Sequence, residues 1–183
     1  MAFLAALWLP IVLAAVIVFV ASSIIHMVLP YHHSDYKKLP DEEKAREALR
    51  GLPPGLYFTP FCTHKEMKTP EMQQKYKQGP VALLTVFQSS PPAMGKYMAL
   101  WFVYCLVIGF FVAYLTFATI LPGARYLAVF RVAGTAAFMT YSLGPLANGI
   151  WKGLPWSNVI KEVIDGLVYA LLTAGTFGWL WPH

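Results

Sequence analysis

The chain has 183 residues, of which 57% are hydrophobic and only 13% are charged, about half the charged fraction of a soluble domain. This composition excludes an ordinary soluble domain and indicates a membrane protein. Ten of the 14 Lys and Arg residues and seven of the nine Asp and Glu residues lie between Tyr31 and Lys96. A segment of mixed charge is typical of a surface that faces water and anionic lipid headgroups, so we expect no nucleic-acid partner.

A first membrane helix is predicted at about residues 3–29. No residue from Ala2 to Ile25 is ionisable, and at 1.5 Å per residue this run can cross a hydrocarbon core about 30 Å thick. The run has no basic segment before it and is longer than the core of a signal peptide. We therefore expect an anchor that is retained.

Residues 30–96 form a predicted extramembrane segment, either a small α+β unit or irregular. Asp41 is placed to cap a short helix that ends near Arg50, and Thr69-Pro70 to open a second one that runs to Lys77. Two apolar runs, residues 55–61 and 81–87, are bounded by Pro and Gly and are interpreted as short strands.

Three further membrane helices are predicted at about residues 97–121, 126–147 and 158–181. Turns at Pro122-Gly123 and Gly153-Leu154-Pro155 separate them. The predicted fold class is an all-α membrane protein with four transmembrane helices, in which residues 97–183 pack with the first helix, residues 1–29, as one domain.

Four crossings would place both termini on one side of the bilayer. Near the helix ends, more basic residues lie on the side of the long loop than on the opposite side. The positive-inside rule therefore predicts a cytoplasmic loop and both termini outside, in a membrane that we expect to be a bacterial inner membrane.

Small residues recur along the last predicted helix at intervals of four, at Gly166, Ala170, Ala174 and Gly178. This spacing places them on one face and lets another helix approach closely. The spacing alone does not distinguish a contact within the chain from one between chains.

The same helix carries a polar stripe, with Glu162, Asp165, Tyr169 and Thr173 at spacings of three or four. Ionisable groups inside a bilayer are costly and suggest a proton or cation path. The acids also lie in the first turns of the helix, where carboxylates complement the helix dipole and can anchor it at the water boundary. Both interpretations stay open.

A group of potential metal ligands follows the first helix, comprising His26, His32 and His33, with Cys62 and His64 further along the loop. Imidazole and thiolate groups can bind a transition metal, and histidine is also a ligand of haem. Their spacing matches no established signature, and histidines also gather at the headgroup level without binding a metal. The cofactor is therefore open: none, a transition metal or haem.

The segments Gly149–Trp156, GIWKGLPW, and Val163–Tyr169, VIDGLVY, precede an Ala/Gly-rich closing helix. This pattern resembles a family of small bacterial four-helix integral membrane proteins of unknown function. The resemblance covers helices one, three and four, whereas the 30–96 loop is longer here. It implies a fold and a compartment but no activity.

Motifs of soluble-type catalysis, such as a phosphate-binding Gly-rich loop, are missing from the sequence, so an enzyme is not the leading expectation. We expect an accessory or structural subunit of a membrane complex or a homo-oligomer. One alternative is a small oligomeric transporter or channel that uses the polar stripe. A second alternative is a membrane protein that binds a metal or haem.

Overall fold

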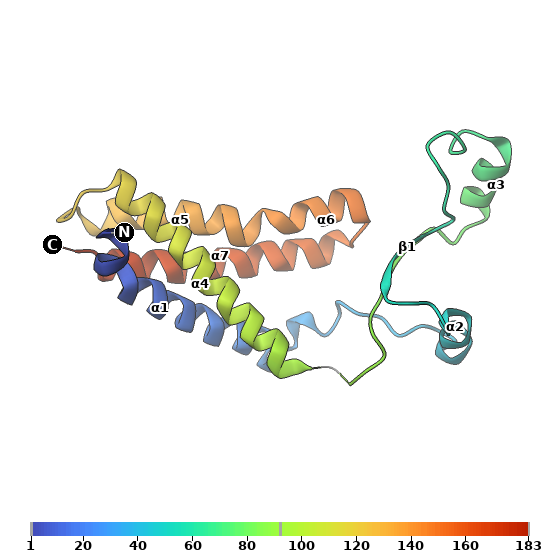
Figure 1. The fold of residues 1–183 in the computed structure, drawn as a ribbon, viewed down its shortest axis with the longest axis horizontal. Coiled ribbons are helices and arrows are strands. Elements are labelled where there is room, and N and C mark those ends of the chain that lie inside the picture. Colours follow the sequence, from blue (N-terminus) through green and yellow to red (C-terminus); the bar gives the residue numbers. More distant parts are fainter. Residues whose placement is uncertain (1, 92, 183) are drawn as a thin grey trace. The chain divides into compact units, whose positions relative to one another are not determined.

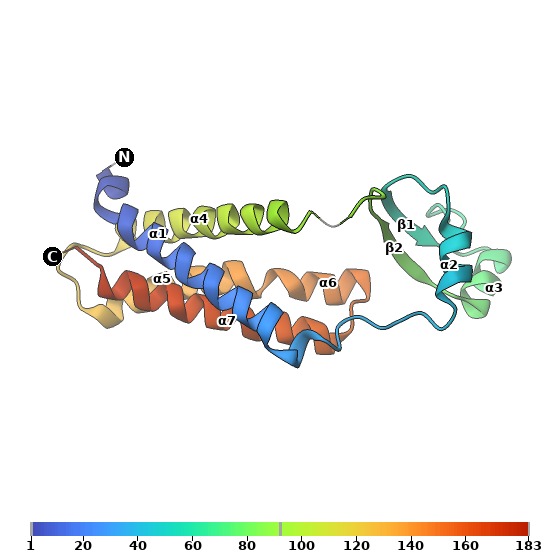
Figure 2. The ribbon, with the colours of Figure 1, turned by 90° about the horizontal axis from the view of Figure 1, so that it is seen from below.

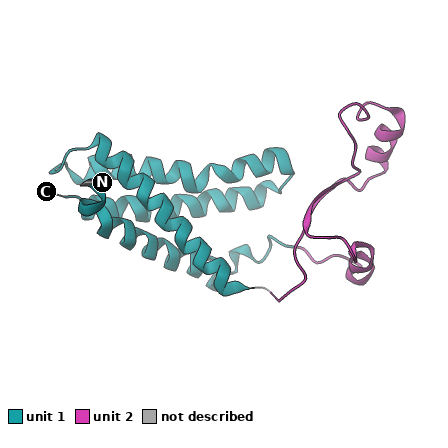
Figure 3. Ribbon diagram, viewed as in Figure 1, with its two compact units in different colours: residues 1–36, 93–183 teal, residues 37–92 magenta. Residues whose placement is uncertain are grey.

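The computed structural model describes residues 2–91 and 93–182 and divides into two compact units (Figure 3). One unit comprises Met1–Tyr36 with Ala93–His183 and is helical, and the other comprises Lys37–Pro92. The sequence-based division placed residues 30–36 in the extramembrane loop. In the structure they belong to the helical unit, because their side chains bind to its last helix.

Five helices build the first unit (Figures 1 and 2): α1 (Ala2–Ser23), α4 (Met94–Thr119), α5 (Tyr126–Ser142), α6 (Gly144–Lys152) and α7 (Trp156–Trp179). Helix α7 packs most extensively on α5 and also contacts α1, while α4 packs on α1 and α5. The start of α1 and the end of α7 lie at the same end of this unit (Figure 1).

Three segments are long and apolar enough to cross a membrane, namely Phe3–Val28, Met94–Thr119 and Tyr126–Lys152. The last includes α5 and α6, which continue almost without interruption, so this helix extends beyond its predicted end at residue 147. Helix α7 has a comparable length but carries Lys161, Glu162 and Asp165. The mostly helical fold is therefore confirmed, with three helices that are long and apolar enough to cross a membrane, and the fourth crossing stays a prediction.

The turns predicted at Pro122-Gly123 and at Gly153-Leu154-Pro155 each contain a glycine with a positive φ angle. Gly123 and Gly153 have positive φ angles of 78° and 67°, a conformation that other residues rarely adopt. Helix α1 changes to a π-helical turn at Ile24–Val28, and a short 3-10 turn, Pro30–His32, follows. Leu29 between them is extended, as expected of a residue before proline.

The core of the helical unit combines small and large residues. On α5, Ala133 and Ala137 are fully buried, and Phe177 of α7 is a large side chain with no exposure. At Gly109 of α4 a Cβ atom would lie 3.3 Å from the carbonyl oxygen of Ile11, so the backbones of α1 and α4 approach closely here. Close approach through small residues is the usual way that membrane helices pack.

The second unit confirms the predicted small α+β segment. Helix α2 (Glu42–Leu49) begins after Asp41, whose side chain accepts a hydrogen bond from the Lys44 backbone, and α3 (Pro70–Gln78) begins after Thr69, which caps it in the same way. Strands β1 (Gly55–Thr59) and β2 (Ala82–Val86) form an antiparallel pair, with Gly55 opposite Val86 and Thr59 opposite Ala82.

Candidate functional site

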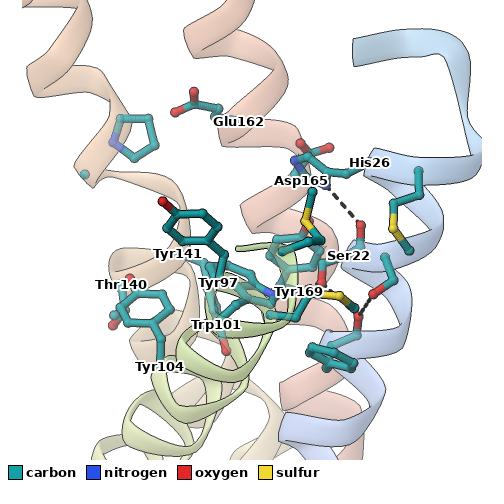
Figure 4. A pocket seen from close by; sticks show the side chains of 17 residues that line it. Ser22, His26, Tyr97, Trp101, Tyr104, Thr140, Tyr141, Glu162, Asp165 and Tyr169 are labelled. Carbon is teal, nitrogen blue, oxygen red and sulfur yellow. Dashed lines mark hydrogen bonds between the residues drawn. The ribbon is translucent and has the colours of Figure 1, made fainter. Parts of the chain in front are cut away.

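A cavity of about 540 Å³ lies among α1, α4, α5, α6 and α7 (Figure 4). Much of its wall is aromatic: Tyr97, Trp101 and Tyr104 come from α4, Tyr141 from α5 and Tyr169 from α7. The rings of Trp101, Tyr141 and Tyr169 pack together, with centroids 5.6 Å apart for the two tyrosines and 6.1 Å apart for Trp101 and Tyr169. This volume and lining suit a small apolar molecule.

Polar side chains enter the cavity from α1 and α7. Helix α1 and its π-helical turn provide Ser22 and His26, and α7 provides Glu162 and Asp165 (Figure 4). The hydroxyl of Ser22 accepts a hydrogen bond of 2.8 Å from Nε1 of Trp101. The cavity therefore has aromatic walls and a polar group at one side, which is the pattern of a site for an amphiphilic ligand.

The hydroxyl of Tyr169 is buried in the wall of this cavity. Tyr169 is only 4% exposed, and its Oη atom has no hydrogen-bond partner among the described residues. An unpaired buried hydroxyl costs roughly 1–3 kcal/mol, so such groups are rare and call for an explanation. A bound molecule that accepts a hydrogen bond from Tyr169 would explain this unpaired hydroxyl.

Beside the cavity, His32 joins the segment after α1 to helix α7. Its Nδ1 atom lies 2.6 Å from Oδ2 of Asp35, and its Nε2 atom lies 2.9 Å from Oδ2 of Asp165. The imidazole ring therefore has a carboxyl oxygen of an aspartate beside each of its two nitrogens. The three side chains are mostly buried, with exposures of 10%, 14% and 6% in the order His32, Asp35, Asp165.

Lys161 of α7 completes this cluster. Its Nζ atom donates to Oδ1 of Asp35 at 2.6 Å, to the carbonyl oxygen of Tyr31 at 2.7 Å and to Oγ of Ser34 at 2.8 Å. Burial opposes the charge of Asp35, but the hydrogen bonds from Lys161 and His32 outweigh it and hold the pKa of this carboxyl below its usual value. The buried charge of Lys161 therefore has an opposite partner in Asp35, which is how a buried cluster avoids an uncompensated charge.

Tyr31 binds to the other oxygen of Asp165. Its hydroxyl lies 3.0 Å from Oδ1 of Asp165 and 3.0 Å from the carbonyl oxygen of Lys161. Burial, and then the hydrogen bond to the Asp165 carboxylate, raise the pKa of the Tyr31 phenol, so it stays a donor. Both oxygens of Asp165 are thus held in place.

His26 lies next to His32 although six residues separate them in the sequence. The two rings stack with centroids 4.3 Å apart and an angle of 10° between their planes. The Nδ1 atom of His26 lies 3.0 Å from the carbonyl oxygen of Ser22, to which it donates. One ligand atom each from His26, His32 and Asp165 lie within 4.8 Å of one another.

Two members of the predicted metal-ligand group come together within the helical unit. His26 and His32 come together, but their third neighbour is Asp165, which we predicted as part of a transport path. His33 is exposed and lies outside this cluster. Cys62 and His64 belong to the other unit, where the Cys62 sulfur lies 3.2 Å from the Tyr76 hydroxyl.

The predicted polar stripe of α7 occupies different environments along its length. Glu162 is exposed at the cavity, whereas Asp165 and Tyr169 are buried in its wall. Thr173 is buried, does not line the cavity and donates its hydroxyl to the carbonyl oxygen of Tyr169. The residues that line the cavity therefore include the first three members of the stripe but not the fourth.

The small residues of α7 make close contacts inside the chain. A Cβ atom on Gly166 would lie 2.5 Å from Oγ of Ser142 and 2.7 Å from the carbonyl oxygen of Tyr141, and Ala174 lies against Gly134 of α5. Gly178 lies against the ring of Tyr126, and Ala170 is buried. This face of α7 therefore makes helix contacts within a single chain.

Tyr31, Asp35 and Trp101 were not among the site residues predicted from the sequence. Lys161 lies four residues before Asp165, a spacing typical of an ion pair on one helix, but the structure pairs Lys161 with Asp35. The available signal for a buried charged cluster was a lysine and a carboxylate on the face of α7 that packs on the core. The partner segment, 126 residues away in the sequence, carried no matching pattern.

No family model, curated protein or solved structure matches this chain. The resemblance to small four-helix membrane proteins stays a prediction. Function must therefore be argued from the cavity and the charged cluster.

Proposed function

We propose that this chain is an integral membrane protein that binds a small amphiphilic molecule in the cavity between α1, α4, α5 and α7. The buried, unpaired hydroxyl of Tyr169 in the cavity wall carries this proposal. A volume of about 540 Å³ lies within the range of typical ligand sites, roughly 300–1,000 Å³. In this proposal the Tyr169 hydroxyl donates a hydrogen bond to an acceptor atom of the bound molecule.

The lining defines the chemistry of this ligand. Trp101 and the surrounding tyrosines offer flat, polarisable surfaces, which favour a ring or an unsaturated chain. Met27, Met94 and Met98 add flexible side chains that adapt to an irregular apolar body. Ser22, His26 and Glu162 offer hydrogen bonds to a polar end. The ligand class is therefore an apolar molecule that carries at least one hydrogen-bond acceptor.

Binding is favoured over conduction because the cavity does not continue along α7. Beyond Tyr169 the next polar group of the stripe, Thr173, is satisfied within its own helix. Val112 of α4 and Phe177 of α7, both in the core of the helical unit, are apolar and almost fully buried. A single chain offers no polar path at this level among its described residues, which leaves the transporter hypothesis dependent on an oligomer.

The accessory-subunit hypothesis loses part of its motivation. It relied on an abundance of small-residue faces, but Gly166 and Ala174 contact α5 of the same chain. A homo-oligomer or a membrane complex as partner stays a prediction.

We further propose that α7 crosses the bilayer with the other three long helices. All its charged residues lie within its first turns, and residues 166–179 are uncharged. Lys161 and Asp165 are neutralised by the cluster, which lowers the cost of their position. The bundle would then have both termini outside a bacterial inner membrane and the second unit in the cytoplasm.

The topology has a direct test. A reporter enzyme that is active only outside the cytoplasm, fused to the C-terminus, is expected to be active in bacterial cells. The same reporter inserted at residues 63–66, in the second unit, is expected to be silent. The opposite pattern would invert the orientation, and equal activity of the two fusions would mean that α7 does not cross.

The ligand proposal is tested by filling the cavity. Gly144 lines it, and a Cβ atom there would meet nothing within 4 Å, so Gly144→Phe places a ring in open space without a clash. We expect protein extracted gently from native membranes to carry about one small apolar molecule per chain. Gly144→Phe should reduce this amount at least tenfold, as measured by mass spectrometry of solvent extracts.

Gly95→Phe is the matched control, because Gly95 also lies in open space on a helix but does not line the cavity. It should retain the molecule at the level of the unchanged protein. Tyr169→Phe removes only the hydroxyl, and the loss of one hydrogen bond predicts about threefold to tenfold weaker retention. If Gly144→Phe and Gly95→Phe retain the molecule equally, the cavity is not its site.

A further inference from the structure

We infer that His26, His32 and Asp165 form a binding site for a divalent transition-metal ion at the edge of the cavity. One ligand atom each from these three residues lie within 4.8 Å of one another. Two imidazoles and one carboxylate suit first-row divalent ions such as Zn²⁺, Co²⁺ or Fe²⁺. This inference goes beyond the binding of an apolar molecule and does not depend on which molecule the cavity holds.

Local backbone structure brings the two histidines together. His26 lies in the π-helical turn at the end of α1, and His32 ends the 3-10 turn that follows. The two turns fold the segment back, so the rings stack with centroids 4.3 Å apart. A π-helical turn is rare and is often found at functional sites.

All three side chains already have the supporting hydrogen bonds that metal ligands require. His26 donates from Nδ1 to the carbonyl oxygen of Ser22, which leaves its Nε2 atom with a free lone pair. His32 faces Asp35 through Nδ1 at 2.6 Å, an arrangement that orients the ring and strengthens Nε2 as a ligand. Such supporting partners are typical of real metal sites and are not needed by interfacial histidines.

The third ligand is prepared in the same way. Tyr31 donates to Oδ1 of Asp165, so Oδ2 is the oxygen available to a metal. In the structure Oδ2 lies 2.9 Å from Nε2 of His32, with the ring hydrogen between them. A bound cation would replace this hydrogen and bind to both atoms.

The site would keep open positions for a further ligand. Three protein ligands leave a tetrahedral or octahedral ion incompletely coordinated, as in sites where a water or substrate also binds. His26 and Asp165 both line the cavity, so these positions would face it. Lys161 does not compete with the metal for Asp165, because its ammonium group is held by Asp35.

The experiment uses the full-length protein without a histidine tag, purified in mild detergent, stripped with a chelator and titrated with Co²⁺ and Zn²⁺. We expect one Co²⁺ per chain, with visible absorption bands that Zn²⁺ removes by competition. His26→Ala should weaken binding at least tenfold. Asp35→Asn, which removes the carboxylate that supports His32 and also pairs with Lys161, should weaken it about 10-fold to 100-fold.

The variants separate this site from adventitious binding. His26→Ala removes no partner of the charged cluster, so its fold should persist, and an unchanged thermal midpoint would verify this. His33→Ala and His64→Ala serve as controls and should bind Co²⁺ like the unchanged protein. Less than half an equivalent of Co²⁺ on the unchanged protein, or equal affinity in His26→Ala, would overturn the inference.

The apolar-ligand proposal and the metal-site proposal can be tested independently of each other. Gly144→Phe should lose the apolar molecule and keep the metal, whereas His26→Ala should lose the metal and keep the fold. A chain that binds Co²⁺ at this site but carries no apolar molecule would support the metal site alone.

Discussion

Gly166→Ala is expected to destabilise the protein by roughly 3 kcal/mol, at the upper end of the range for overpacking. The added methyl group would lie 2.5 Å from Oγ of Ser142 and 2.7 Å from backbone atoms of Tyr141. Backbone atoms cannot turn aside, so α5 and α7 would have to separate where their contact is tightest. Unfolding by a denaturing detergent, followed by tryptophan fluorescence, measures the change in free energy.

Two other glycines of the same helix provide controls. At Gly175 a methyl group would meet only the Tyr126 hydroxyl, at 3.7 Å, so Gly175→Ala should be neutral or stabilise by up to about 1 kcal/mol. At Gly178 it would overlap the ring of Tyr126, a side chain that is 46% exposed and can turn away. Gly178→Ala should therefore cost less than about 1 kcal/mol. Equal stability of the Gly166 and Gly175 variants would contradict the close contact with α5.

Lys161→Met is expected to release the segment Tyr31–Asp35 from α7. Removing the ammonium group leaves Asp35 with His32 as its only charged partner and leaves the carbonyl oxygen of Tyr31 without its donor. Loss of one partner of a buried ion pair costs about 3 kcal/mol at the low end of the measured range. A free-energy cost of this size corresponds to about 100-fold faster hydrogen exchange at the backbone amides of His33 and Asp35.

Lys44→Met tests the same type of ion pair at the surface. Lys44 and Asp41 are 2.8 Å apart, like Lys161 and Asp35, but their side chains are 88% and 51% exposed. Because water screens an exposed pair, this substitution should change stability by less than about 1 kcal/mol. Hydrogen–deuterium exchange with mass spectrometry on both variants measures the contrast. Unaltered exchange at residues 31–35 in Lys161→Met would show that the segment is held by other contacts.

Much of the secondary structure could be predicted because its signals are local. Asp41 and Thr69 cap the two short helices, and each cap requires only a side chain and a backbone amide three residues later. Gly153 ends α6 in a left-handed conformation, and Gly123 adopts a positive φ in the turn after α4, because glycine tolerates this conformation. The predicted start of the second membrane helix at residue 97 was three residues late, since Met94 already lies in α4. Predicted helix boundaries differ in this way from the observed ones when the flanking residues have no strong preference for helix or loop.

The candidate site could be predicted only in pieces. His26 and His32 belonged to the predicted metal-ligand group. Asp165 and Tyr169 belonged to the predicted polar stripe. Nothing local relates His32 to Asp165, which are 133 residues apart in the chain yet share a hydrogen bond. Cys62 and His64 were grouped with the histidines of the same predicted loop, but they belong to the other unit, so their part in a metal site stays a prediction.

The amino-acid sequence by itself determined the mostly helical fold, three helices that are long and apolar enough to cross a membrane, the turns between them and the small paired strands of the second unit. These features follow from hydrophobic runs, periodicity and capping, which act within a few residues. Only the tertiary structure decided which charges neutralise one another and which polar atoms stay unpaired. The free energy of a buried charge depends on a partner placed within about 3 Å, and helix packing sets that position.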